Sequence, residues 1–326
     1  MFIMKQIVSF FAITIAFLIQ NTHAQDPGYV LVIHGGAGNI TRERISPEKQ
    51  VLYEQKLLEA LAAGESVLAS GGTAMEAVIA AVQLMEECPL FNAGRGAVFN
   101  AEGKNELDAS VMDGKTMKAG AVAGVTIIKS PVEAALRVMD SSAHVLLAGR
   151  GAEEFARVQG LRLVEPDYFY TEESWQEFQK VKARLEKEGR KGTVGAVALD
   201  EQGNLAAATS TGGMVNKKYG RIGDSPLIGA GTYANNQSCA VSCTGHGEFF
   251  IRNSVAYDVS ARMLYLGETV EEASGFIVNE KLKSQGASGG LIALDKDGNI
   301  AMPFNTSGMF RGYVKKGEKA QVYVFR

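Results

Sequence analysis

Thr193 is the residue whose surroundings most clearly indicate chemistry. It follows a charged segment and precedes an apolar run, in the order Lys191-Gly192-Thr193-Val194-Gly195. A threonine hydroxyl is a weak nucleophile at neutral pH unless a base lies beside it, and a free α-amine on the same residue can be that base. Thr193 acquires such an amine only if the Gly192–Thr193 bond is cut. The sequence therefore predicts a chain that cleaves itself before it becomes active.

Gly192 suits such a cut. An N→O acyl shift requires the Thr193 hydroxyl to reach the preceding carbonyl, and glycine tolerates the strained backbone that this approach demands. The cut would divide the mature chain into an α-subunit, residues 25–192, and a β-subunit, residues 193–326, which together form one domain.

Further polar residues lie between 193 and 248, where two polar blocks follow apolar runs. The blocks are Thr209-Ser210-Thr211-Gly212-Gly213 and Ser242-Cys243-Thr244-Gly245-His246-Gly247-Glu248, with Arg221-Ile222-Gly223-Asp224 between them. Taken alone, the opposite charges of Arg221 and Asp224 favour a local surface ion pair, worth ~0 to 1 kcal/mol.

Several other functions lack their required sequence features. No HExxH or paired Cys/His spacing occurs, and neither GxGxxG nor GxxxxGK[ST] is present. The net charge is −3, and no cluster of Lys and Arg is interleaved with aromatic residues. Zinc hydrolases and nucleotide-binding enzymes are therefore not indicated, and nucleic acid is not an expected partner.

The elements that must position Thr193 are strands at both ends of each half, with helices grouped between them. This grouping favours an α+β fold in which sheets pack on sheets beneath helices, a four-layer αββα sandwich. Residues 171–191, rich in Glu, Gln, Lys and Arg, predict a solvated helix or mobile tail rather than core. Helices are expected over 47–70, 73–86 with Thr73 as cap, from Pro131, 249–266 and 270–284, and strands over 29–33, 97–100, 107–112, 119–129, 193–200, 204–210, 227–232, 237–243, 288–295, 299–304, 308–313 and 321–325.

The N-terminal 24 residues of this 326-residue chain are typical of a cleaved secretory signal. Lys5 precedes an apolar stretch, and small residues precede the expected cut after Ala24. That stretch is shorter than the ~18 to 20 residues that span a bilayer, which disfavours a membrane anchor. We expect an exported protein, periplasmic in a Gram-negative source, with no membrane contact after signal removal. Its cysteines are expected to be buried free thiols: Cys88, Cys239 and Cys243.

The blocks around Thr193, Thr211, Arg221 and Thr244 resemble the plant-type L-asparaginases, also called isoaspartyl peptidases or β-aspartyl-peptidases. The similarity covers residues 29–313. It includes the upstream blocks His34-Gly35-Gly36-Ala37-Gly38 and Glu87-Cys88-Pro89-Leu90-Phe91-Asn92-Ala93-Gly94. That family has the N-terminal-nucleophile hydrolase fold, an αββα sandwich.

The resemblance implies catalytic roles. Thr193 would be nucleophile and, after self-cleavage, base through its α-amine. It would attack the side-chain carbonyl of L-asparagine or of a β-aspartyl dipeptide, and water would hydrolyse the acyl-threonine ester. The Thr244 hydroxyl and the Gly245 N–H would form the oxyanion hole, and Thr211 would tune Thr193.

The resemblance also implies how the zwitterionic substrate is held. Arg221 would bind its α-carboxylate and Asp224 its α-ammonium, in a pocket shared with Thr244, Gly245 and Gly247. Beside the matching blocks, this interpretation outweighs the surface ion pair.

Three further features follow from the resemblance. Catalysis would need no cofactor, the enzyme would be a dimer of αβ units, and backbone carbonyls would hold a structural Na⁺. The carbonyls would be those of Glu86, Cys88, Phe91 and Ala93.

Two residues near the motifs have open roles. Asn92 either lines the active site or is a turn residue. His246 either narrows the pocket, adding a titrating group, or points to solvent. His34 is expected to brace the glycine-rich turn rather than act chemically.

Two alternative functions stay open at this point. Glycosylasparaginase uses the same chemistry on asparagine-linked sugars, but usually has aspartate where Gly192 stands. An exported amino-acid-binding protein would use Arg221 and Asp224 only to bind, and its chain would stay intact.

Overall fold

The computed structural model describes residues 28–183 and 192–326. The expected signal peptide and most of the basic stretch before Gly192 lie outside the described residues. Within the described ranges, no helix is both long and apolar enough to span a membrane.

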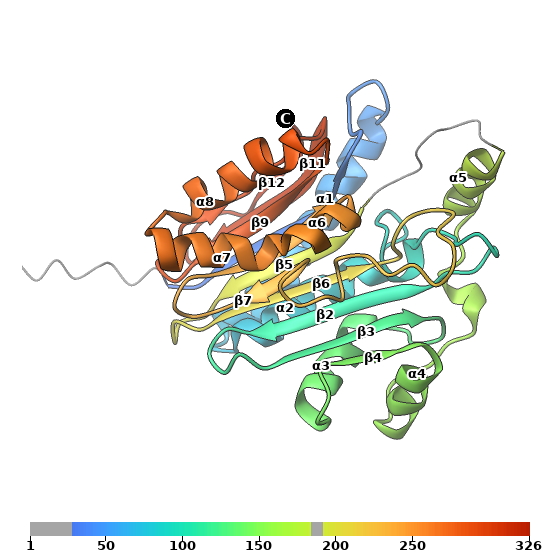
Figure 1. Cartoon of the computed structure of the whole chain (residues 1–326), viewed down its shortest axis with the longest axis horizontal. Helices are drawn as coiled ribbons and strands as arrows, with labels where there is room; N and C mark the ends of the chain where they lie inside the picture. The colour runs from blue at the N-terminus through green and yellow to red at the C-terminus, as the bar shows by residue number, and fades with distance from the viewer. Residues whose placement is uncertain (1–27, 184–191) are drawn as a thin grey trace, which may run out of the picture.

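The larger sheet has eight strands in the order β12-β11-β1-β5-β6-β2-β3-β4 (Figure 1). Its strands pair antiparallel, except β3 with β4. Their bounds are β1 Val30–Gly38, β2 Leu107–Asp113, β3 Ala119–Val125, β4 Leu146–Ala148, β5 Val194–Leu199, β6 Leu205–Thr211, β11 Gly308–Lys315 and β12 Gln321–Phe325.

The smaller sheet has four antiparallel strands in the order β10-β9-β8-β7. It packs face to face on the larger sheet, with β8 and β9 against β1 and β5. Its strands are β7 Thr232–Ala234, β8 Cys239–Gly245, β9 Gly289–Asp295 and β10 Ile300–Ala301.

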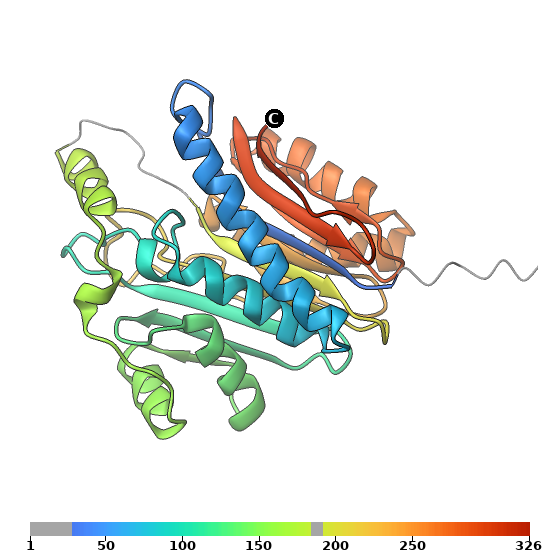
Figure 2. The same ribbon diagram turned by 180° about the vertical axis from the view of Figure 1, so that it is seen from behind.

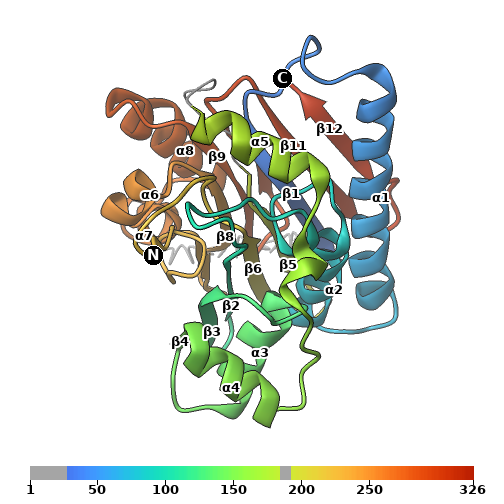
Figure 3. The same ribbon diagram turned by 90° about the vertical axis from the view of Figure 1, so that its right-hand side faces the viewer.

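Helices cover both outer faces. α1, Pro47–Ala69, α2, Ala74–Glu87, and α3, Pro131–Ser141, pack on the larger sheet, as seen from behind in Figure 2. α7, Val255–Leu266, and α8, Val270–Phe276, cover the smaller sheet, and a π-helical turn, Ile277–Leu282, continues α8. Figure 3 shows the helix, sheet, sheet, helix order, so the expected αββα sandwich is confirmed. The remaining elements are the 3-10 turns Gly94–Gly96 and Pro166–Phe169 and helices α4 Gly149–Val158, α5 Glu172–Lys182 and α6 Gly247–Asn253.

Local sequence signals explain several helix ends. Thr73 caps α2 as predicted, because its hydroxyl accepts from the Glu76 N–H at 3.2 Å and the Glu76 carboxylate accepts from the Thr73 N–H at 2.8 Å. The single helix predicted over 249–266 is instead two helices, α6 and α7. Ser254 lies between them with φ of 48°, a left-handed conformation that interrupts a helix.

Helix α5 corrects the prediction that residues 171–191 contribute nothing to the core. Phe178 is only 1% exposed, and Trp175 packs edge-on against Phe99, with 5.0 Å between the ring centres. Trp175 and Phe178 lie three positions apart, on one face of an otherwise charged helix. A strand was also predicted over 97–100, but Phe99 there forms only an isolated bridge with Asn105.

The space between the two sheets contains both apolar and polar residues. Val197 and Leu199 of β5 belong to the apolar cluster between the sheets, whereas Val194 and Ala196 face the helices. Because strand side chains alternate, Gly195 and Thr193 share the inner face with Val197. The three cysteines are buried and form no disulfide, as predicted.

Candidate active site

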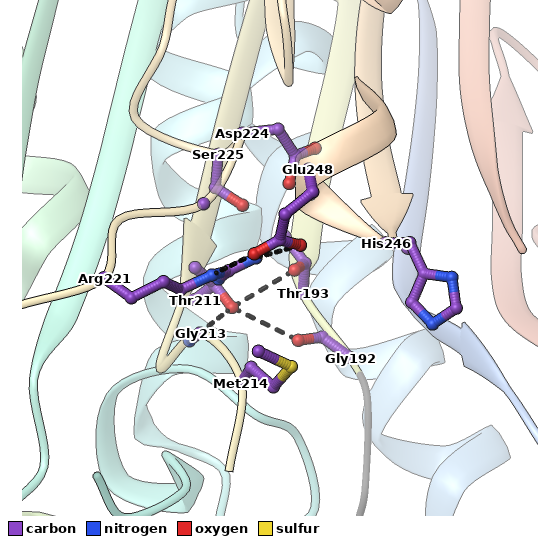
Figure 4. Close-up of a pocket in the computed structure, with 13 residues that line it drawn as sticks. Gly192, Thr193, Thr211, Gly213, Met214, Arg221, Asp224, Ser225, His246 and Glu248 are labelled. Atoms are coloured by element: carbon purple, nitrogen blue, oxygen red, sulfur yellow. Dashed lines mark hydrogen bonds and ion pairs between the residues drawn. The ribbon is translucent and has the colours of Figure 1, made fainter. Parts of the chain in front are cut away.

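A pocket opens where the strands that carry the candidate residues begin or end. Thr193 immediately precedes β5, Thr211 ends β6, and Gly245 ends β8. These three residues line the pocket together with Arg221 and Asp224 (Figure 4). The fold thus brings together candidates that are up to 52 positions apart, from Thr193 to Gly245.

Thr193 and Thr211 form the centre of the pocket. The Thr193 hydroxyl donates to Thr211 Oγ1 at 3.1 Å, and Thr211 Oγ1 donates to the Gly192 carbonyl at 3.2 Å. Thr193 is 7% exposed. The candidate nucleophile is therefore sheltered, hydrogen-bonded and next to the carbonyl that precedes it.

Asn92 is one of the two residues whose role sequence reasoning left open. Its Nδ2 donates to the Gly192 carbonyl at 2.8 Å and to the Gly213 carbonyl at 2.8 Å. The Gly192 carbonyl thus accepts from both Asn92 and Thr211. The signal in the sequence was the position of Asn92 inside a matching block, which could not show what it contacts.

Gly36 lies directly against the bond predicted to be cut. Its φ is 110°, and a Cβ there would lie 2.8 Å from Gly192 Cα. This left-handed conformation and close approach both require glycine. The glycine-rich turn after His34 therefore holds the backbone against the Gly192–Thr193 junction.

Arg221 pairs with Glu248, not with Asp224, its neighbour in sequence. Its Nε and Nη2 donate to the two carboxylate oxygens of Glu248, each at 2.9 Å. These hydrogen bonds lower the pKa of Glu248. Sequence reasoning did not single out Glu248, although it ends the block Thr244-Gly245-His246-Gly247-Glu248.

Asp224 is a buried carboxylate without a full set of partners. It is 5% exposed, and its Oδ2 has no hydrogen-bond partner among the described residues. Burial raises the pKa of Asp224 to about 7, and the nearby Arg221 charge only partly opposes this. A carboxylate desolvated in this way is suited to receive a cation.

Gly247 leaves space between Arg221 and Asp224. A Cβ on Gly247 would lie 2.7 Å from Arg221 Nη2 and 2.9 Å from Asp224 Oδ1. A side chain at this position would therefore displace both charged groups. Because Gly247 has no side chain, the Arg221 guanidinium and the Asp224 carboxylate can face the same small space.

Thr244 lies behind the pocket rather than in its lining. It is 1% exposed, and its Oγ1 accepts from the Ala37 N–H at 3.3 Å. Its neighbour Gly245 does line the pocket. The predicted oxyanion pair is therefore adjacent to the pocket, with the Gly245 backbone nearer to it.

The two histidines near the site have different surroundings. The His246 ring turns away from Thr193 in Figure 4, and its Nδ1 lies 3.4 Å from the Ser288 N–H. His34 is fully buried, and its Nε2 lies 2.9 Å from Ser242 Oγ. Burial lowers the pKa of His34 to about 3, against a smaller opposing effect of the Thr193 backbone, so the ring is neutral.

The loop predicted to hold Na⁺ directs two carbonyls at the turn Gly94–Gly96. A Cβ on Gly94 would lie 2.2 Å from the Glu86 oxygen, and one on Gly96 would lie 2.0 Å from the Phe91 oxygen. The Cys88 and Ala93 carbonyls accept backbone N–H groups at 3.4 and 3.1 Å. Carbonyl oxygens are ligands that hard cations prefer, so the donor chemistry fits. The described residues contain no cluster of His, Cys, Asp and Glu suited to a metal.

Comparisons with known proteins agree with this geometry. The sequence pattern of a family described as Asparaginase matches residues 27–324. The chain is similar to the isoaspartyl peptidase of Salmonella typhimurium, with 51% identity over 308 residues, covering 91% of this chain and 98% of that protein. It is 50% identical to the isoaspartyl peptidase of Escherichia coli, covering 91% of this chain and 96% of the relative. It is 42% identical to the isoaspartyl peptidase/L-asparaginase of Rattus norvegicus, covering 90% and 88%.

Proposed function

The chain belongs to the asparaginase family of N-terminal-nucleophile hydrolases, and from this premise we propose that it hydrolyses β-aspartyl dipeptides and L-asparagine at Thr193. The observation that carries the proposal is the hydrogen-bonded set Thr193, Thr211 and Gly192 at the base of a pocket lined by Arg221 and Asp224. The relatives named above are isoaspartyl peptidases, which favours this activity over glycosylasparaginase.

Self-cleavage would begin at the Gly192 carbonyl. Asn92 and Thr211 donate to its oxygen, and the same two donors would stabilise the negative charge that develops when Thr193 Oγ1 attacks. The new C–O bond forms as the C–N bond breaks, which releases the Thr193 amine and leaves an ester. Water then hydrolyses the ester, giving a Gly192 carboxylate and a free Thr193 hydroxyl and α-amine.

Substrate hydrolysis would repeat this chemistry on a bound molecule. The free α-amine accepts the Thr193 hydroxyl proton while Oγ1 attacks the side-chain carbonyl of the substrate. The Thr244 hydroxyl and the Gly245 N–H would hold the oxyanion. The protonated amine then donates to the leaving ammonia or amino acid, and water releases L-aspartate from the acyl-threonine ester.

Substrate recognition would rest on Arg221 and Asp224. Asp224 would offer to the α-ammonium a carboxylate oxygen that no described residue hydrogen-bonds. Arg221 would bind the α-carboxylate, and because Nε and Nη2 already donate to Glu248, its Nη1 faces the least competition. Glu248 would then hold the guanidinium in place.

The loop carbonyls of Glu86, Cys88, Phe91 and Ala93 would hold a structural Na⁺. Its contribution would be to fix the loop that carries Asn92. No catalytic step passes through it, and we propose that catalysis needs no other cofactor.

Two properties beyond the activity are proposed on the sequence pattern and the resemblance. The chain would lose residues 1–24 during export to the periplasm, which mass spectrometry of the mature N-terminus would test. It would assemble as a dimer of αβ units, which light scattering during size-exclusion chromatography would test.

A denaturing gel of purified protein tests the main proposal. We expect two fragments, one ending at Gly192 and one beginning at Thr193. A chain that stays intact on long incubation would instead favour the amino-acid-binding alternative. Turnover of L-asparagine, a β-aspartyl dipeptide and an asparagine-linked sugar, measured side by side, then ranks the substrates. Activity on the sugar alone would contradict the proposal.

A further inference from the structure

A chain of buried hydroxyl groups crosses the space between the two sheets beneath the pocket. Its members are Ser110 of β2, Thr232 of β7, Thr209 of β6 and Ser242 of β8. Successive oxygen atoms are 2.7, 2.6 and 2.7 Å apart. All four residues are fully buried. Such a network is costly to bury unless its members bond to one another, so each strand must present its hydroxyl at a defined place.

The two ends of this hydroxyl chain reach the two halves of the candidate site. At one end, Ser110 Oγ donates to the Ser225 carbonyl at 2.6 Å, and Thr232 Oγ1 lies 3.3 Å from the same oxygen. Ser225 lines the pocket and follows Asp224. At the other end, Ser242 Oγ lies 2.9 Å from His34 Nε2.

The His34 end lies beside the strand that carries the nucleophile. His34 pairs with Gly195 in the register of β1 and β5, and Gly195 is two residues after Thr193. A Cβ on Gly195 would lie 2.0 Å from Ser242 Oγ. Glycine at this position therefore leaves the space that the end of the hydroxyl chain occupies.

Asp224 needs an anchor of this kind. It lies in the connection between β6 and β7, residues 212–231, which contains no helix or strand. Its Oδ2 has no hydrogen-bond partner among residues 28–183 and 192–326, so in this part of the chain that oxygen does not hold the carboxylate in place. The backbone must therefore place it, through the Leu227 N–H on the Asp224 carbonyl and the Ser110 hydroxyl on the Ser225 carbonyl, with the Thr232 hydroxyl bonded to Ser110 and 3.3 Å from the same carbonyl.

We infer that Ser110 and Thr232 are positioning residues that fix Ser225, and with it Asp224, relative to Thr193. The inference rests on the proposed function for its substrate, because Asp224 receives the α-ammonium there. The hydroxyl chain continues through Thr209 and Ser242 to His34 of β1, which pairs with Gly195 of β5. The distance between the group that binds the substrate and the group that attacks it is thus set inside the sandwich, not by the loop alone.

Thr232 offers a matched pair of variants. Thr232→Val keeps the shape of the side chain and removes the hydroxyl, whereas Thr232→Ser keeps the hydroxyl and removes a methyl group. For Thr232→Val we expect complete self-cleavage, a KM for L-asparagine raised about tenfold and a kcat within about threefold of the unchanged protein. For Thr232→Ser we expect a KM within about twofold. Equal KM values for the two variants would overturn the inference.

Two controls separate positioning from stability. Ser110→Ala removes one oxygen atom from the same chain and should also raise KM, providing a second test if Thr232→Val folds poorly. Ser260→Ala removes an equally buried hydroxyl that bonds Ser238 at 2.7 Å outside the site. It should lower the melting temperature without changing KM. If KM rose in every variant in proportion to the fall in melting temperature, Ser260→Ala included, the result would contradict a positioning role.

Calorimetric binding of L-aspartate, the expected product, makes the test independent of turnover. The Kd of Thr232→Val should rise about tenfold, as KM does. If the unchanged protein binds L-aspartate but hydrolyses nothing, the proposed function fails, while weaker binding by Thr232→Val still supports the inference. An unchanged Kd in Thr232→Val overturns the inference even when the enzyme is active.

Discussion

The two ends of the space between the sheets contrast sharply. In β5, Leu199 and Val197 face the smaller sheet at one end, and the next positions on that face are Gly195 and Thr193 at the pocket. Three other strands of the larger sheet also change from apolar to polar residues toward the pocket. In β1, Val30 and Val32 are followed by His34. In β6, Leu205 and Ala207 are followed by Thr209 and Thr211, and in β2, Met112 is preceded by Ser110 and Asp108. Burial of the apolar end stabilises the fold, whereas the hydrogen bonds at the polar end position the residues of the candidate site.

Replacing Thr193 should have the largest effect, and only at the polar end. Thr193→Ala removes the hydroxyl that both reactions need, so we expect an uncleaved chain and activity reduced by more than about 10⁴-fold. Thr193→Ser is the matched control and should still cleave itself. The gel and L-asparagine turnover measure both effects. Two fragments from Thr193→Ala would remove this residue from the mechanism.

Replacing Leu199 should lower stability and leave activity nearly unchanged. Leu199 is fully buried, and Leu199→Ala leaves a cavity, which should lower the free energy of unfolding by about 3 kcal/mol. Urea unfolding of the single chain, in a Thr193→Ala background, measures this change. In the self-cleaving protein, kcat/KM should stay within about twofold. Leu266→Ala, at a position 64% exposed, is the control. A large loss of kcat/KM in Leu199→Ala would show that the two ends are not separable.

Asp224→Asn should weaken substrate binding without lowering the stability of the protein. Losing the charge-assisted bond to the ammonium costs about 2 kcal/mol, or about 30-fold in KM. Stability should not fall with it. Because burial raises the pKa of Asp224 from 3.8 to about 7, the folded protein holds the proton more tightly than the unfolded chain. Ionisation of Asp224 therefore lowers the free energy of unfolding as pH rises towards 7.

Removing that charge should leave the protein at least as stable at pH 8, as measured by urea unfolding. Glu271→Gln is the control, because it removes a carboxylate charge at an exposed position. A fall in stability at pH 8 in Asp224→Asn alone would mean that the carboxylate stabilises the empty pocket.

The smallest effect should be a pH dependence of binding. Asp224 attracts the ammonium only when ionised, so the inhibition constant of L-aspartate should rise as pH falls below about 7, by up to about tenfold per unit. The profile should be flat in Asp224→Asn. A flat profile in the unchanged protein would show that another group neutralises the ammonium.

Much of the fold could be predicted because its signals are local. The capping box at Thr73, the helix beginning at Pro131 and the strands before and after Asp200 all depend on residues within a few positions of one another. Errors arose where local composition was misleading. The charged surface of α5 concealed the buried Phe178, although Trp175 was expected to be partly packed, and the apolar pattern over 249–266 concealed the turn at Ser254.

Most residues of the candidate site could be predicted from the sequence, but Glu248 and the contacts between the residues could not. Arg221 and Asp224 line one pocket as expected, but the partner of Arg221, Glu248, lies 27 positions away and was not singled out. Asn92 was left undecided, yet it donates to Gly192, 100 positions away. No periodicity or spacing encodes a contact of this kind, because it depends on how the loops leave the ends of different strands.

The sequence by itself indicated the candidate nucleophile, the blocks around it and the layered class of the fold, since each depends on residue type and local pattern. Tertiary structure alone decided which side chains meet. It buried the Asp224 carboxylate without a partner for one oxygen, set two donors on the Gly192 carbonyl, and aligned hydroxyls from four strands beneath the pocket. The physical reason is that desolvation and hydrogen-bond geometry arise only when distant segments pack together.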